Sequence, residues 1–252
     1  MGSTFESLGM TLNPCFDRHP MEGLTAGRIV ISYGEIELRV AMCLGSVIGD
    51  QEMAMRTLFR LLGESARINV ADALMVKAFE RESLKAEYAD AIGATRFCLK
   101  LRNQFAHCHW ADDPRTEKGV YFATLQESAD NKEQFNYWFV HIDDPLLDEQ
   151  WSYMQYAAEC LDYINAEYLY RTKKTEAHAF LSPAKRTPPR LHNPPMTYIP
   201  PWLDEDQRRR HLEHFQRSEA GDQKPLPRPR GPNLSKRQRR SARVKAAQSV
   251  KS

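Results

Sequence analysis

The stretch that decides the fold lies near the middle of the chain and reads Lys100-Leu101-Arg102-Asn103-Gln104-Phe105-Ala106-His107-Cys108-His109. Apolar residues lead into it at helical spacing, which predicts that it closes an amphipathic helix beginning near Ile92. On that helix Asn103 and His107 lie one turn apart on the same face, whereas Arg102 lies about 140° round from His107. The sequence thus gathers an arginine, an amide and a histidine at one helix end.

The remainder of the first 175 residues predicts a mainly helical domain with one β-hairpin. Two alternating aromatic and β-branched runs predict the hairpin at about 119–142. Asp143 or Asp144 followed by Pro145 predicts the start of a long last helix that ends near Lys174. The preceding helices are expected at about 22–48, 51–62, 69–90, and from Ile92 into the motif.

Charge and proline content divide the chain at about residue 175. Residues 176–252 carry 17 Lys and Arg against 7 Asp and Glu and hold 11 of the 15 prolines, whereas the first 175 residues have a net charge of −8. A segment this polar, without apolar periodicity, cannot offset its ordering entropy by burial. We therefore predict a flexible arm over 1–21, a helical bundle with an inserted hairpin over 22–175, and a Pro-rich, basic, largely disordered tail over 176–252.

The end of the tail holds a dense group of cations. Such a group releases phosphate counterions and binds RNA without regard to sequence, although a solvated, solubilising end has the same composition. The candidate RNA-binding residues are Lys236, Arg237, Arg239, Arg240, Arg243 and Lys245.

Cysteine usage and hydropathy favour a reduced, cytoplasmic protein. The five cysteines are widely spaced and form no C-x-x-C pair, and no apolar run has the roughly 18–20 residues that a membrane helix needs. Cys98, His107, Cys108 and His109 could be interpreted as zinc ligands, but three of them are adjacent and cannot easily bind one ion together. We predict no metal, no cofactor and no membrane association.

The pattern R-N-x-x-A-H at Arg102 to His107, with Ser32-Tyr33-Gly34-Glu35-Ile36-Glu37 upstream, resembles the R-x4-H form of the HEPN superfamily. HEPN domains are small and α-helical, and they include metal-independent RNA endonucleases, many of them in bacterial toxin and antiphage systems. The resemblance covers about residues 21–174. It implies a homodimer in which two copies of Arg102 and His107 share a cleft, with cleavage leaving a cyclic phosphate and a 5′-hydroxyl.

The side chains suit that chemistry. An imidazole exchanges protons near neutrality, so His107 is the candidate general base that takes the 2′-hydroxyl proton. A guanidinium donates two parallel hydrogen bonds to phosphate, so Arg102 is the candidate transition-state stabiliser. Asn103 would anchor the phosphate or the histidine tautomer, Glu35 would orient His107 or line the cleft, and His109 would support these residues without touching the substrate. His109 stands where related toxins carry a tyrosine that a nucleotidyltransferase antitoxin modifies, which puts that partner in doubt.

Plainer interpretations remain open. Arg102 could pair with a carboxylate while His107 interacts with the last turn of its helix. The domain could also be a non-catalytic module that dimerises and recruits nucleic acid or a protein through its basic tail. A third possibility is a regulator in a defence operon that is active only with an antitoxin or another partner protein.

Overall fold

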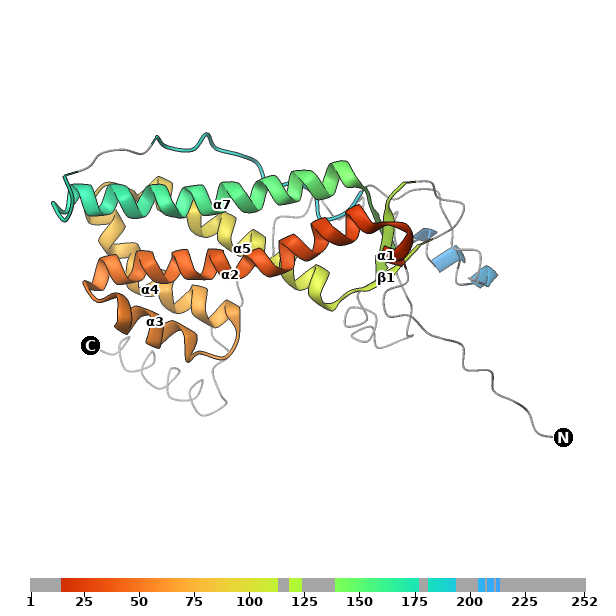
Figure 1. The fold of residues 1–252 in the computed structure, drawn as a ribbon, viewed down its shortest axis with the longest axis horizontal. Coiled ribbons are helices and arrows are strands. Elements are labelled where there is room, and N and C mark those ends of the chain that lie inside the picture. Colours follow the sequence, from red (N-terminus) through yellow and green to blue (C-terminus); the bar gives the residue numbers. More distant parts are fainter. Residues whose placement is uncertain are drawn as a thin grey trace, which may run out of the picture. The chain divides into compact units, whose positions relative to one another are not determined.

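The structure is a computed structural model that describes residues 15–112, 118–123, 139–176 and 181–193, together with 204–206, 208–210 and 212–213. The described residues are mainly helical, with one small antiparallel sheet (Figure 1). The elements are α1 (Cys15–Arg18), α2 (Pro20–Ile48), α3 (Gln51–Phe59), α4 (Glu64–Arg81), α5 (Lys85–His107), β1 (His109–Ala111), β2 (Val120–Ala123), β3 (Val140–Ile142) and α7 (Asp144–Arg171).

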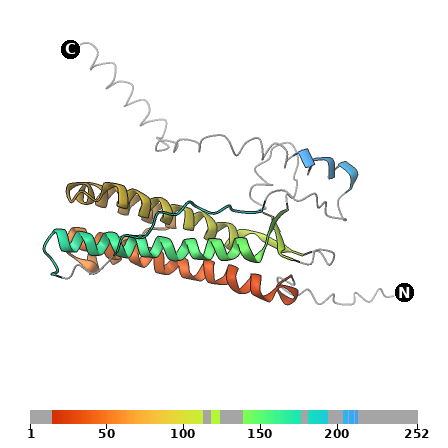
Figure 2. The ribbon, with the colours of Figure 1, turned by 90° about the horizontal axis from the view of Figure 1, so that it is seen from above.

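The long helices α2 and α7 pack along each other, and α5 packs against both. Helix α4 lies against α2 and α5, and the short α3 packs mainly on α2. Figure 2 shows α2 along one side of this bundle. The side chains between the helices form one core, which includes the fully buried Ile29, Ile36, Leu44, Met75, Phe79, Ile92, Leu101, Leu147, Leu161 and Ile164.

Local sequence signals set several helix ends as predicted. Gly49 ends α2 with a left-handed backbone (φ 79°), a conformation that costs glycine little, and Asp50 then caps α3 by accepting a hydrogen bond from the Met53 amide. Asp143 caps α7 in the same way through the Leu146 amide, at 3.1 Å, with Pro145 in the first turn. These predicted boundaries are confirmed.

The sheet has the strand order β1-β2-β3, and each neighbouring pair is antiparallel. Trp110 of β1 lies opposite Phe122, and Tyr121 lies opposite His141. The rings of Trp110 and Phe122 both pack on Phe105 of α5, which joins the sheet to the end of the motif helix. The predicted hairpin is therefore part of a sheet whose extra strand, β1, comes directly after the motif; residues 124–138 lie outside the described residues.

Several expected boundaries differ in the structure: α3 ends at Phe59 rather than near residue 62, and α4 begins at Glu64 rather than near residue 69. The break before the motif helix falls at Glu82–Leu84 rather than near Asp90, because Ser83 has a positive φ of 57° and Leu84 is buried in the core. The predicted arm is also too long: residues 15–18 form α1 and Pro20 begins α2, with Cys15 buried. A proline followed by helix-compatible residues starts a helix as readily as it breaks one.

Part of the predicted disordered tail follows a defined path on the bundle. Residues 181–193, here called the strap, have no helix or strand and run along α7 (Figure 2). The side-chain amide of buried Gln150 donates to the carbonyls of Arg190 (2.7 Å) and Leu191 (3.1 Å), and Arg186 lies over the ring of Tyr156. The strap is held through its backbone carbonyls, which every residue has. Its ordered path therefore needs no apolar periodicity, and the composition of the tail gave no sign of it.

The chain divides into two compact units at Pro200, and the residues described in the second unit, between 204 and 213, are largely helical. Within the described residues, no helix is long and apolar enough to cross a membrane.

Candidate active site

The motif occupies the last turns of α5, and helix packing fixes how far each side chain is exposed. Phe105 is buried in the core, Arg102 and Asn103 are partly exposed, and His107 is exposed as the last residue of the helix. Cys108 ends α5 because its backbone is extended (φ −86°, ψ 159°), and its amide still donates to the Gln104 carbonyl. The sequence prediction that the motif closes a helix is confirmed.

Arg102 has two oxygen partners within its own chain. Its Nη1 donates to Oδ1 of Asn103 at 2.9 Å, and its Nη2 lies 3.2 Å from Oε1 of Glu64. Glu64 is the first residue of α4, and about a quarter of each side chain in the ion pair is exposed. Asn103 thus holds the guanidinium from one side, and the Glu64 carboxylate occupies another edge of it.

A second ion pair joins α2 to α4 on the same side of the bundle. Nη1 of Arg67 donates to both carboxylate oxygens of Glu37, at 3.0 and 3.1 Å, and its Nε donates to the Leu61 carbonyl. The guanidinium also lies 5.2 Å from the centre of the Phe59 ring. Because Arg67 is held on all these sides, it fixes the start of α4 and with it the position of Glu64.

Tyr33 is a buried side chain that interacts electrostatically with residues of both ion pairs. Its side chain is buried, and its hydroxyl has no hydrogen-bond partner among the described residues. Burial raises the pKa of this phenol, the carboxylates of Glu37 and Glu64 raise it further, and the charge of Arg102 lowers it. Tyr33 therefore stays protonated and places a neutral hydroxyl in the field of the motif arginine.

The single chain does not join Arg102 to His107. No hydrogen bond or ion pair among the described residues involves the His107 side chain, and Arg102 turns towards Asn103 and Glu64 instead. The spacing of five residues explains this, since the two side chains leave the helix about 140° apart. His107 is accordingly free to meet a ligand or a second chain.

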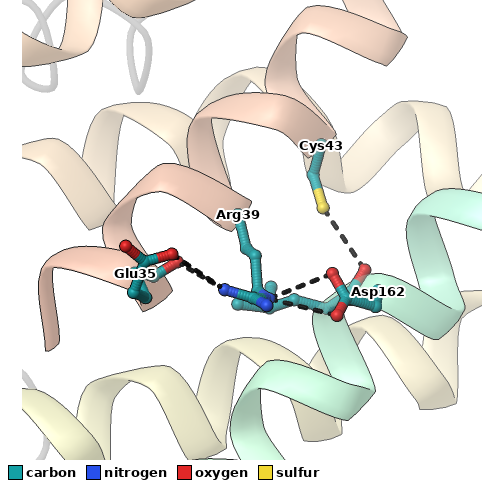
Figure 3. A network of polar contacts seen from close by, with 5 residues as sticks. Glu35, Arg39, Cys43 and Asp162 are labelled. Carbon is teal, nitrogen blue, oxygen red and sulfur yellow. Dashed lines mark hydrogen bonds and ion pairs between the residues drawn. The ribbon is translucent and has the colours of Figure 1, made fainter. Parts of the chain in front are cut away.

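Glu35 does not orient His107 within the chain. It lies on the exposed face of α2 and pairs with Arg39, whose Nε also reaches both oxygens of Asp162 on α7 at 3.1 Å (Figure 3). This network ties α2 to α7 beside buried Cys43, whose thiol donates to the Leu161 carbonyl. The acidic residue that pairs with Arg102 is Glu64 instead.

His109 is the exposed first residue of β1 and lies opposite Ala123. It has no contact with Arg102 or His107 among those that the structure describes, so its proposed supporting role has no structural basis within one chain.

The alternative of a metal site finds little support. Among the described residues, no group of three or more His, Cys, Asp or Glu side chains is arranged to hold an ion. Burial raises the pKa of both Cys98 and Cys108 to about 12, so in the absence of a metal ion both thiols stay protonated at neutral pH.

The motif also contacts the strap. The side-chain amide of Gln104 donates to the Leu191 carbonyl at 3.3 Å. The backbone amide of Asn193 donates to the backbone carbonyl of His141 in β3 at 2.8 Å. At Asn193 the strap therefore lies beside the sheet that follows the motif. The candidate RNA-binding residues of the tail, Lys236, Arg237, Arg239, Arg240, Arg243 and Lys245, lie outside the described residues.

A cavity of about 530 Å³ lies between α7 and the strap, and its lining includes Asp148, Ser152 and Arg186 but none of Arg102, Asn103 and His107. The motif therefore lies outside this cavity, and His107 is exposed on the surface.

Comparison of the chain with protein-family models, curated proteins and solved structures found no match. The HEPN resemblance therefore depends on the motif residues of the sequence alone.

Proposed function

We propose that this protein is a metal-independent endoribonuclease of the HEPN type. It acts on cytoplasmic RNA as a homodimer and has a role in a toxin or antiphage system. The observation that carries the proposal is the state of the motif: Arg102 is held ready by Asn103 and countered by Glu64, while the His107 imidazole is exposed without a partner among the described residues.

Arg102 would exchange Glu64 for a phosphate. The Glu64 ion pair is partly exposed, and such pairs contribute only about 0–1 kcal/mol. A phosphate offers the same guanidinium two parallel, charge-assisted hydrogen bonds. RNA can therefore displace the carboxylate at low cost, while Asn103 keeps the guanidinium in place.

His107 would then act as the general base. It takes the proton of the ribose 2′-hydroxyl, the 2′-oxygen forms a bond to phosphorus, and the bond from phosphorus to the 5′-oxygen breaks. The leaving oxygen takes up a proton, which gives a 2′,3′-cyclic phosphate and a 5′-hydroxyl. Arg102 stabilises the charge that grows on the phosphate oxygens.

The test is incubation of full-length protein with total RNA and a tRNA pool in EDTA, followed by analysis of fragments and their ends. We expect wild type to cut and to leave cyclic phosphates, and His107→Ala to lose about 100- to 10,000-fold in rate. Arg102→Ala should be similarly impaired. Arg96→Ala is the matched control, because Arg96 lies on the same helix and pairs with Asp72 of α4. Equal cleavage by wild type and His107→Ala would refute the proposal.

The second candidate is a non-catalytic module that binds nucleic acid or a protein through its basic tail. The observation that favours it is that one chain neutralises Arg102 with Glu64 and does not bring His107 to it. RNA binding without cleavage, abolished by removal of residues 194–252 beyond the strap, would support this function. A regulator that needs an antitoxin or another partner protein would show cleavage only when that partner is added.

A further inference from the structure

The solvent face of α2 is apolar along most of its length. Ile31 is 80% exposed, and Met21, Leu24, Leu38 and Met42 are between 36% and 59% exposed. A surface helix normally buries its apolar stripe and presents polar residues to water. Helix α2 instead has apolar residues on both faces, because its opposite side supplies Ile29, Ile36 and Leu44 to the core.

The exposed residues follow a regular repeat. Together with Arg28 and Glu35, these five apolar residues occupy seven positions that are separated alternately by three and four residues. This spacing places them on one line along the helix, about 32 Å long at ~1.5 Å per residue. Gly27 and Gly34 flank this line, and the space that a Cβ at either glycine would occupy is open. We call the line the α2 seam; its residues are Met21, Leu24, Arg28, Ile31, Glu35, Leu38 and Met42.

The order of residues along the seam is symmetric. The seam reads Met, Leu, Arg, Ile, Glu, Leu, Met, so reversing it returns the same apolar residues and exchanges the one cation for the one anion. A twofold interface must be complementary to itself under such a reversal. Two antiparallel copies of α2 that cross at Ile31 place Leu24 opposite Leu38 and Met21 opposite Met42.

The two charged residues decide the direction. In the antiparallel pair, Arg28 of each copy lies near Glu35 of the other, whereas a parallel pair would oppose like charges. Arg28 is exposed and has no ion-pair partner among the described residues, and Glu35 is only loosely paired with Arg39, at 3.5 Å. Both are therefore available to a second chain.

We propose that the α2 seam is the contact surface for a second copy of this chain, packed antiparallel and centred on Ile31. The interface fits a homodimer better than an unrelated partner because both its apolar spacing and its charges are complementary to themselves. The seam lies on the face of α2 opposite Tyr33, which is buried and interacts electrostatically with Arg102, so this contact is distinct from the shared-cleft dimer that the HEPN resemblance implies. It forms whether or not the chain cuts RNA, so a failure of the cleavage experiment and a failure of this one are distinguishable.

The experiment is sedimentation of the full-length protein at micromolar concentrations. Wild type should sediment as a dimer, and Ile31→Glu, which places two carboxylates together at the twofold axis, should raise the dissociation constant at least about 100-fold. Leu74→Glu is the matched control, because Leu74 is an apolar residue of α4 that is 50% exposed and lies outside the seam. Circular dichroism and thermal melting would confirm that each variant is folded.

A charge exchange tests the antiparallel direction. Arg28→Glu alone and Glu35→Arg alone should each weaken the dimer, and the double variant that carries both should restore it, because each new glutamate again faces an arginine. A monomeric wild type, a dimer that tolerates Ile31→Glu, or a double variant weaker than both single ones would overturn the proposal.

Discussion

Replacing Glu64 by glutamine should free Arg102 and tighten nucleic-acid binding. The substitution keeps the size of the side chain and removes the charge that lies 3.2 Å from the guanidinium. About a quarter of each side chain is exposed, so the lost interaction has a net value of about 1 kcal/mol rather than the larger Coulomb energy of a buried pair. Since 1.4 kcal/mol corresponds to a factor of ten, we expect binding to tighten about fivefold.

The assay is fluorescence anisotropy with a single-stranded 2′-O-methyl oligonucleotide, which binds as RNA does but lacks the attacking hydroxyl. The matched control is Asp72→Asn, which removes one negative charge from α4 and frees Arg96 of α5, an arginine outside the motif. If general electrostatics governed binding, the two variants would tighten it equally. That result, or weaker binding by Glu64→Gln, would refute the assignment of Glu64 as the residue that competes with phosphate.

The fold itself supplies two further predictions. Gln150→Leu removes both hydrogen bonds that hold the strap carbonyls, so limited proteolysis should cut within 181–193 at least about tenfold faster than in wild type, while cleavage elsewhere in the bundle stays unchanged. The second prediction concerns pH. Burial raises the pKa of Cys98 and Cys108 from about 9 to about 12, so each thiol loses its proton at a lower pH in the unfolded chain than in the folded protein. Stability should therefore fall as pH rises from about 9 towards 12, and a Cys98→Ala, Cys108→Ala double variant should show a smaller loss of melting temperature between pH 8 and 10.

Local signals predicted the helical bundle well, because each depends on residues close in sequence. The glycine at 49, the cap at Asp50 and the Asp143–Pro145 start of α7 all act within one turn of the chain. The break at Ser83 could not be predicted in this way, since it depends on Leu84 reaching the core contributed by other helices. The helical pattern continues through this region, and only tertiary packing selects where the chain turns.

The candidate site, like the fold, could be predicted from the sequence only where it depends on local spacing. The sequence alone placed Arg102, Asn103 and His107 on one helix end, because their spacing is local. It missed Glu64, because the helix that begins there was expected to start near Asn69, and it chose Glu35, which the structure pairs with Arg39.

The setting of the motif argues that His107 serves more than the fold. Arg102, Asn103 and Gln104 all have partners that stabilise this chain, in Glu64, in each other and in the strap. For His107 a purely structural role offers only the interaction of a protonated imidazole with the helix C-terminus, about 0.3–1 kcal/mol, and only while the imidazole is charged. That interaction uses no arginine and amide beside it, whereas the phosphate chemistry proposed above would use all three, with the imidazole exposed.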